Sequence, residues 1–292
     1  MKLGLGTVQF GMSYGIANRT GQVPPQEVAS ILALAADHDI QVLDTAALYG
    51  NCEEVLGNVL APSHGFRIVT KTPRFGTKAS SEADVSFLVD TLQKSLQNLR
   101  KTTIYGLLIH HTDDLLSQGG AALFKAMEGF KDQGLVQKIG VSVYTGEQID
   151  EVLERFRIDI VQLPVSILDQ RLIKSGHLSK LKECGVEVHA RSVLLQGLLL
   201  MEPNRLHPYF ASAKEHLRRF REMLDGYGAS PLQAALGFVC NLDEVDVVLC
   251  GVESRTQLSQ LMVLPAHSIG KEDYSRFALS DVAILNPANW KL

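Results

Sequence analysis

Four polar residues of this chain, Asp44, Tyr49, Lys71 and His110, are of types that together can move a proton. A tyrosine hydroxyl has a pKa of about 10, so it is a poor acid at neutral pH unless its neighbours stabilise the phenolate. A lysine ammonium would lower that pKa, and a carboxylate paired with the lysine would keep it charged and oriented. A histidine could donate a hydrogen bond to a carbonyl oxygen. The set suits carbonyl reduction, and because none of the four supplies a hydride, a nicotinamide cofactor is required.

Each of these residues lies at or just past the end of an apolar run typical of a β-strand; the runs are QVLDTA, FRIVTK and YGLLIH. A barrel of parallel strands keeps its catalytic groups at this rim. Taken singly, Asp44 could instead cap a helix, Tyr49 could be a half-buried loop aromatic, and His110 could be a core histidine bonded to backbone. Lys71 needs a partner at the end of an apolar strand, and Asp44 is a candidate.

Eight strand-like runs alternate with segments of helical period, such as the one in which Val28, Ile31, Leu32 and Ala35 recur. The runs are Leu3–Thr7, Val42–Ala46, Phe66–Lys71, Tyr105–His110, Lys138–Ser142, Ile158–Leu163, Glu187–Ser192 and Val245–Gly251. Eight βα units predict an α/β fold, a (β/α)8 TIM barrel with residues 1–292 as a single domain. A doubly wound open sheet is the alternative, but the glycines after the first strand lack GxGxxG spacing.

Helix boundaries are marked by polar and glycine residues. Ser230 and Gln233 have the spacing of a capping box at a helix start. Gly134 and Gly185 each end a helical run just before a strand, where a left-handed residue without Cβ is favoured. These signals support the alternation of helices and strands.

Composition restricts the class of protein. A chain of 292 residues with 46% hydrophobic content can bury a large core, and it has no apolar run long enough to span a membrane. The N-terminus lacks the features of a signal peptide, so we expect a cytoplasmic protein. The four cysteines lie far apart without zinc-like spacing and are expected to be free thiols. A net charge of −4 gives no sign of a nucleic-acid surface, and oligomeric state is not indicated.

Several segments resemble the aldo-keto reductase superfamily. DTAALYGNCEEVLGNVL resembles its D-T-A-x-x-Y-G-x-x-E-x-x-L-G segment, VTKTP its catalytic lysine strand, and LLIHHTDDL its histidine strand, with Thr112 in place of proline. LGLGTVQFG, KIGVSVY, VQLPVSILDQR, RSVLLQGLLL and VLCGVESRTQL match further landmarks in the right order over essentially the whole chain. The resemblance implies a (β/α)8 barrel and NADPH-dependent reduction of aldehydes or ketones. Asp44, Tyr49, Lys71 and His110 would be the tetrad, with Tyr49 as the general acid.

The resemblance also implies a set of cofactor-binding residues, from the nicotinamide to the adenosine end. These are Gly6, Thr7, Ser142, Gln162, Arg191, Ser192, Leu194, Gln196, Gly197, Gly251, Ser254, Arg255 and Gln257. Ser142 and Gln162 match the positions that hold the carboxamide, but Val143 stands where the family has asparagine. Arg191 replaces the aromatic expected to stack on the nicotinamide.

GVESRTQLSQL resembles the segment that binds the adenosine 2′-phosphate, although the family's Glu-Asn pair is here Gln260-Leu261. A phosphate site needs positive charge, and Arg255 is the only cation in this loop, where Glu253 would oppose it. The resemblance implies NADPH, with NADH as the alternative.

Arg191 leads to a hypothesis about the two redox forms of the cofactor. The oxidised nicotinamide ring is cationic and the reduced ring is neutral, so a guanidinium in this position should disfavour the oxidised form. The alternative is that Arg191 pairs with an acidic neighbour and does not contact the ring.

His111 raises the question of a metal, since Asp113 and Asp114 follow it. Adjacent residues on a strand point to opposite faces, and Lys71 and Gln162 are poor ligands, so a metal-dependent TIM-barrel hydrolase is the weaker alternative. No metal is expected. The resemblance instead places the residue after the histidine in the substrate pocket, and we expect this pocket to draw also on Val8 and Gln9.

The substrate is expected to be a small-molecule carbonyl. The loop from Leu198 to Phe210, with Arg205, His207 and Tyr209, should add polar and aromatic groups that suit a sugar-like or nucleotide-linked carbonyl. The opening LGLGTVQFGMSYGI resembles reductases of bacterial polysaccharide pathways. A second class of function is a cofactor-sensing regulatory protein on the same fold. The C-terminal NPANWKL could place Trp290 over the barrel or outside it.

Overall fold

Eight short parallel strands form a closed barrel in which each strand pairs with the next along the chain and β8 pairs with β1. This computed structural model describes residues 2–61, 63–75, 82–263 and 269–290. The strands are β1 (Leu3–Gly6), β2 (Val42–Asp44), β3 (Arg67–Lys71), β4 (Ile104–Ile109), β5 (Val136–Ser142), β6 (Ile160–Pro164), β7 (Glu187–Arg191) and β8 (Val247–Gly251). All lie within two residues of their predicted ends, so the TIM barrel is confirmed and the open sheet is wrong.

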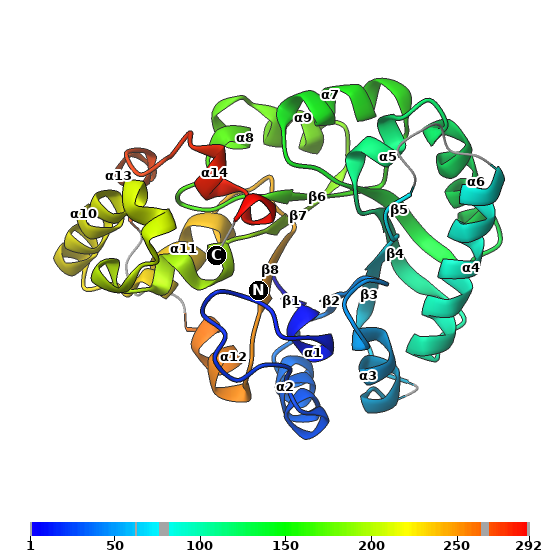
Figure 1. Ribbon diagram of the computed structural model, residues 1–292, viewed down its shortest axis with the longest axis horizontal. Helices are drawn as coiled ribbons and strands as arrows, with labels where there is room; N and C mark the ends of the chain where they lie inside the picture. The colour runs from blue at the N-terminus through cyan, green and yellow to red at the C-terminus, as the bar shows by residue number, and fades with distance from the viewer. Residues whose placement is uncertain (1, 62, 76–81, 264–268, 291–292) are drawn as a thin grey trace.

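Helices surround this ring of strands, as Figure 1 shows in a view along the barrel. They are α1 (Val8–Gly11), α2 (Pro25–Asp37), α3 (Cys52–Val59), α4 (Glu82–Leu99), α5 (Thr112–Leu116), α6 (Gly120–Asp132), α7 (Gly146–Arg155), α8 (Arg171–Lys174), α9 (His177–Glu183), α10 (Ala211–Tyr227), α11 (Pro231–Cys240), α12 (Arg255–Leu261), α13 (Lys271–Ser275) and α14 (Val282–Leu285). Four 3-10 turns, η1 (Leu195–Leu200), η2 (Pro203–Arg205), η3 (Pro208–Phe210) and η4 (Pro287–Asn289), complete the loops after β7 and near the C-terminus.

The predicted helix boundaries are present. Ser230 Oγ accepts from Gln233 N at 3.2 Å, and Gln233 Oε1 accepts from Ser230 N at 3.1 Å, which completes the capping box of α11. Gly134 and Gly185 have φ of +71° and +70°, the left-handed conformation that ends α6 and α9 before the next strand.

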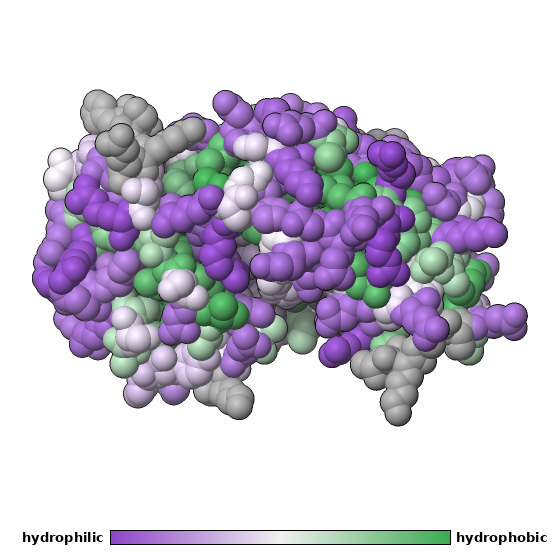
Figure 2. All heavy atoms as spheres, turned by 90° about the horizontal axis from the view of Figure 1, so that it is seen from above, coloured by the Kyte–Doolittle hydropathy of each residue, from purple (hydrophilic) through white to green (hydrophobic). Residues whose placement is uncertain are grey.

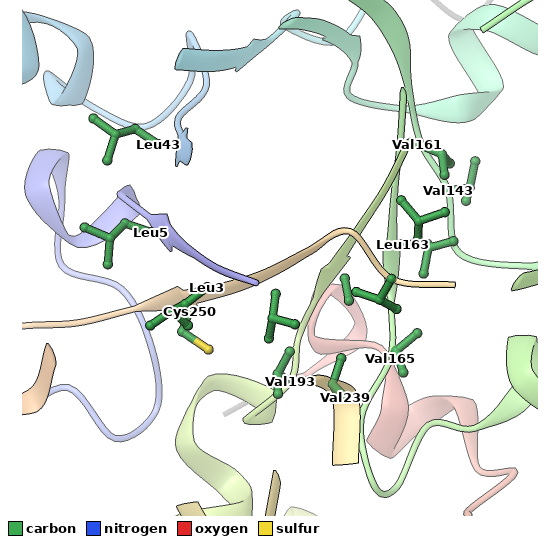
Figure 3. Close-up of a cluster of buried hydrophobic side chains, with 14 of the residues drawn as sticks. Leu3, Leu5, Leu43, Val143, Val161, Leu163, Val165, Val193, Val239 and Cys250 are labelled. Carbon is green, nitrogen blue, oxygen red and sulfur yellow. The ribbon is translucent and has the colours of Figure 1, made fainter. Parts of the chain in front are cut away.

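The apolar core has two layers. The outer layer lies between the strands and the helices, and Figure 3 shows part of it, with Leu5 and Leu43 on neighbouring strands and Leu163 farther round the barrel. Leu5 and Leu43 are paired in the β1–β2 register, and both are fully buried. The inner layer is a separate cluster of strand residues that alternate with the outward-facing ones. Its members are Val42, Val69, Leu108, Ile160, Val247 and Leu249. Alternation along each strand therefore fills the barrel and places its last inward residues at the carboxyl rim.

A polar network lies near the amino-terminal ends of β4, β5 and β7. Glu187 contacts Lys138, accepts from Tyr105 Oη at 2.6 Å, and lies 2.8 Å from Nε2 of the fully buried His189. Burial alone would raise the pKa of the Glu187 carboxyl, but the hydrogen bonds from His189, Lys138 and Tyr105 lower it to about 2. The carboxylate is therefore charged and paired at neutral pH.

The surface in Figure 2 is mostly hydrophilic, with smaller hydrophobic areas between. In the part of the chain that the structure describes, no helix is long and apolar enough to cross a membrane. The four cysteines are free, as expected.

Candidate active site

Asp44 and Lys71 form an ion pair at the carboxyl ends of β2 and β3. Lys71 Nζ donates to both carboxylate oxygens at 2.7 Å and to Thr45 O at 2.9 Å. The Lys71 side chain is 1% exposed, and Asp44 is buried. Since each charge would be costly alone at this depth, the pairing that the sequence suggested is required by the geometry.

Tyr49 lies beside this pair in the loop between β2 and α3. Lys71 Nζ is 5.1 Å from the centre of the Tyr49 ring. Burial, followed by the negative charge of Asp44, raises the pKa of the Tyr49 hydroxyl well above its ordinary value, although Arg191 acts in the opposite direction. The lowering of this pKa expected from Lys71 is wrong for the free protein, because burial and the charge of Asp44 act more strongly in the other direction. Tyr49 is consequently a protonated phenol at neutral pH.

His110 directly follows β4 and approaches Tyr49 edge to face, with ring centres 6.1 Å apart. Burial, the charge of Lys71 and the neighbouring His111 and Arg191 lower the pKa of His110 to about 3. Its imidazole is therefore neutral throughout the neutral range. A neutral ring carries one N–H and can donate a hydrogen bond to an oxygen next to the Tyr49 hydroxyl.

The lowered pKa of His110 should make stability depend on pH. In the unfolded chain this pKa is 6.5, so as the pH falls below that value the unfolded state binds a proton that the folded state does not bind until about pH 3. Protonation then favours unfolding, by about 2 kcal/mol at a pH near 5. When the pH falls from roughly 7 to 5, the free energy of unfolding of His110→Gln should decrease by about 2 kcal/mol less than that of wild type. Urea unfolding at the two pH values measures this. An equal loss in both proteins would contradict this prediction.

A cavity of about 630 Å³ opens above these residues, at the carboxyl ends of the strands. It is lined by Asp44, Tyr49 and His110 of the tetrad; by Gly6, Thr7, Ser142, Gln162, Arg191, Ser192, Leu194, Gln196, Gly197, Gly251 and Gln257 of the expected cofactor set; and by Val8, Gln9 and His111 of the expected substrate pocket. Lys71 lies behind Asp44. Ser254 and Arg255 are not among the residues that line the cavity, although they belong to the same loop as Glu253 and Gln257, which do.

Ser142 ends β5 and Gln162 is the middle residue of β6, paired with Ser142 in the sheet register; both are buried. Gln162 Nε2 donates to Asp44 Oδ1 at 2.7 Å, so this amide also orients the carboxylate, a role that the sequence did not indicate. Thr112 Oγ1 donates to Ser142 O at 2.6 Å. Threonine in place of the family's proline therefore ties the loop after β4 to the end of β5.

Arg191 ends β7 and stacks on Tyr144, with the guanidinium carbon 4.2 Å from the ring centre. It donates to Val143 O at 3.2 Å and to Ser192 Oγ at 3.4 Å. Within the described residues it has no carboxylate partner, so the acidic neighbour considered from the sequence is not found. The guanidinium is a fixed positive charge in the wall beside Tyr49.

The loop after β7 has unusual backbone geometry. Ser192, Leu195 and Gln196 have φ of +60°, +46° and +53°, values that cost energy in residues with a side chain. Gly197 faces the loop after α1, where a Cβ on it would lie 2.5 Å from Ala17. Gln196 Nε2 donates to Tyr14 Oη at 3.1 Å, so the two loops meet across the cavity.

Several predictions about the rim are corrected by the structure. Because β4 ends at Ile109, His110 and His111 both line the cavity, with rings stacked 5.0 Å apart. Of the loop from Leu198 to Phe210, only Leu200 lines it. Arg205, His207 and Tyr209 do not; Tyr209 Oη instead donates to the backbone of the C-terminal segment. Trp290 packs on Phe210 rather than over the cavity, with ring centres 4.9 Å apart.

Some cavity residues were missed from the sequence. Tyr144 lies two residues past the end of β5, and it could have been found by collecting polar residues just past strand ends, as His110 was. Tyr14 and the C-terminal Pro287 and Ala288 could not, since they come from loops without a recognisable pattern. Across the described residues, no group of three or more His, Cys, Asp or Glu side chains is arranged to hold a metal ion.

Residues 2–279 match the model of the Aldo/keto reductase family. The chain belongs to this family. Among the relatives of this family member, Uncharacterized oxidoreductase YcsN of Bacillus subtilis (strain 168) is 30% identical over 193 residues, which cover 60% of this chain and 63% of YcsN, less than two thirds of that relative. NADH-specific methylglyoxal reductase of Escherichia coli (strain K12) is 25% identical over 215 residues, covering 68% of this chain and 65% of that protein.

Among solved structures, this aldo/keto reductase family member is similar to aldo-keto reductase AKR11C1 from Bacillus halodurans in its holo form. The TM-score is 0.74 with 22% identity, over 94% of this chain and 90% of that one. At this identity the likeness shows the fold alone.

A nicotinamide cofactor fits the cavity of this family member on two observations. Gln9 Oε1 and His110 Nδ1 are buried polar atoms without a hydrogen-bond partner in the described part of the chain. A Cβ on Gly251 would lie 2.6 Å from the Gln9 amide, so the absence of a side chain keeps this narrow part of the wall open. Gln9 and His110 both line the cavity, and buried polar atoms without a partner at such a site indicate a polar ligand.

Proposed function

We propose that this protein is a nicotinamide-dependent oxidoreductase that reduces an aldehyde or ketone to an alcohol. The observation that carries the proposal is the meeting, in one cavity, of the protonated Tyr49 and the neutral His110 beside the buried Asp44–Lys71 pair. A proton donor for a developing alkoxide must itself be protonated at the working pH, and the Tyr49 phenol meets this condition.

Each residue has a separate task in this proposal. Tyr49 gives its hydroxyl proton to the carbonyl oxygen, and the neutral His110 donates a hydrogen bond that orients and polarises that oxygen. Lys71 holds its positive charge near the phenol, Asp44 accepts from Lys71 and fixes it in place, and Gln162 in turn orients Asp44. A bound nicotinamide would supply the hydride, held by residues of the wall from Ser142 to Gln257.

The substrate class and the cofactor form are finer proposals. Tyr14, Tyr144 and His111 give the cavity a mixed polar and aromatic wall, which supports a sugar-like or nucleotide-linked carbonyl. The family resemblance supports NADPH, whereas one relative is named NADH-specific methylglyoxal reductase. A cytoplasmic location stays a prediction from the sequence.

A carbonyl screen with NADPH and NADH tests the proposed function. We expect absorbance of the reduced cofactor to fall with at least one aldehyde or ketone, and the panel should include free sugars and nucleotide sugars. Tight cofactor binding without turnover across a broad panel would contradict reduction and favour the sensor. Metal in the purified protein, with hydrolysis and no cofactor binding, would favour the hydrolase.

Arg191 should influence which redox form of the cofactor binds. The fixed guanidinium would repel a cationic oxidised ring more than a neutral reduced ring, so the protein should bind the reduced form more tightly. Replacing Arg191 with tyrosine should bring the two dissociation constants closer, by about tenfold. Fluorescence titration of wild type and Arg191→Tyr with both forms checks this, and an unchanged ratio would count against the hypothesis.

A further inference from the structure

We propose that the adenosine end of this cavity selects NADH over NADPH, with Glu253 as the residue that discriminates between them. This inference rests on the proposed function, since it concerns the cofactor of the same site. It differs from what the family resemblance implied, because Glu253 of the loop between β8 and α12 lines the cavity whereas the neighbouring Arg255 does not.

Glu253 lies two residues past the end of β8, in the cavity wall. Its backbone is fixed, because Glu253 N donates to Gln257 Oε1 at 2.7 Å and Ser254 Oγ accepts from Gln257 N at 3.2 Å. Thr20 Oγ1 donates to Glu253 Oε2 at 3.2 Å. The other carboxylate oxygen, Oε1, has no hydrogen-bond partner among the described residues and is free to accept from a ligand.

A second carboxylate lies against the same loop from helix α2. Glu27 Oε1 accepts from Arg255 N at 2.6 Å, so a carboxylate already occupies a backbone amide at the start of α12. A phosphate there would have to displace Glu27 or lie beside it. Ser254 and Gln257, which the resemblance assigned to phosphate binding, are engaged with each other and with Glu253 N.

The cations nearby do not offset these charges within the cavity. Arg191 is the only Lys or Arg among the described residues that line it, and its guanidinium is stacked on Tyr144 and donates to Val143 O. Arg255 and Arg19 are exposed and are not part of the lining. An NADPH phosphate at this end would therefore meet the Glu253 carboxylate in the wall and the Glu27 carboxylate beside the start of α12, with Arg255 and Arg19 only at the exposed margin.

NADH and NADPH differ in one group at the adenosine ribose. The free ribose hydroxyls of NADH can donate to a carboxylate, and acidic residues accept such hydrogen bonds in other dinucleotide sites. A 2′-phosphate carries no such donor and adds negative charge next to Glu253, which is repulsive. Both effects favour NADH.

Calorimetric titration of the full chain with NADH and NADPH tests the proposal without turnover. We expect NADPH to bind about tenfold or more weakly than NADH to wild type. Glu253→Gln keeps an acceptor for Thr20 but removes the charge, so it should narrow this ratio by about tenfold, and Glu253→Arg should narrow it further. Adenosine 2′,5′-bisphosphate and AMP, which lack the nicotinamide, should show the same change.

Glu54→Gln is the matched control, because Glu54 is an exposed carboxylate that does not line the cavity. The ratio of its dissociation constants for NADPH and NADH should equal that of wild type. Raising the ionic strength should weaken the discrimination, since repulsion is screened. Tighter binding of NADPH to wild type would overturn this inference and leave the proposed function intact. An unchanged ratio in Glu253→Gln would do the same, whereas binding of neither cofactor would overturn both.

Discussion

Replacing Tyr49 with phenylalanine is expected to lower kcat for carbonyl reduction by about 10²-fold or more, because general acid catalysis contributes at least that much. The ring remains, so its contacts with His110 and Lys71 should persist, and the cavity keeps its shape. Only the proton donor is removed. Steady-state kinetics with the best carbonyl of the screen, together with cofactor titration, measure the two effects separately.

In Tyr49→Phe, turnover and cofactor affinity should respond differently. Cofactor affinity should stay nearly constant, since the hydroxyl acts on the carbonyl oxygen in the transition state. Tyr209→Phe is a matched control that removes a hydroxyl outside the cavity, and it should keep wild-type turnover. Equal turnover in Tyr49→Phe and wild type would show that Tyr49 is not the acid.

Replacing Lys71 with methionine is expected to destabilise the fold by about 3–5 kcal/mol, because it leaves the Asp44 carboxylate buried without its counter-charge. Gln162 would still donate to Asp44, but an amide does not neutralise it. The double variant Asp44→Asn with Lys71→Met should recover much of this loss, since no unpaired charge then remains. Urea unfolding of both variants and of wild type measures these free energies.

An ion pair elsewhere in the barrel provides the control. Lys131 Nζ lies 2.6 Å from Asp159 Oδ2, but these side chains are 34% and 30% exposed. Water compensates for the lost partner there, so Lys131→Met should cost no more than about 1 kcal/mol. If Lys71→Met lowered the free energy of unfolding as little as Lys131→Met does, burial of the Asp44–Lys71 pair would not be what makes the loss of Lys71 destabilising.

The barrel could be predicted from the sequence because local pattern and global fold agree. Apolar runs ended in polar residues, and glycines such as Gly134 and Gly185 took the left-handed conformations expected of them. Strand ends were less certain, since hydrogen bonding to neighbours, and not composition, decides where pairing stops. For this reason His110 lies just outside β4, which allows His111 to face the same cavity.

The site was only partly predictable. Residues at strand ends could be collected because parallel strands share one rim. The stacking of Arg191 on Tyr144 and the hydrogen bond from Gln162 to Asp44 depend on side-chain conformations that no spacing specifies. The direction of the Tyr49 pKa was wrongly predicted, because a list of neighbours does not show how deeply the hydroxyl is buried, and burial is the main cause of the raised pKa.

The polar network of Tyr105, Lys138, Glu187 and His189 has a consequence for how this chain can change. It lies at the opposite end of the strands from Tyr49, with a layer of apolar side chains between. Substitutions in the network should therefore appear in a screen for thermal tolerance and be nearly silent in one for chemical selectivity. Because the two ends are separated in this way, the loops around the cavity could diversify toward new carbonyl compounds while the barrel beneath them stayed the same.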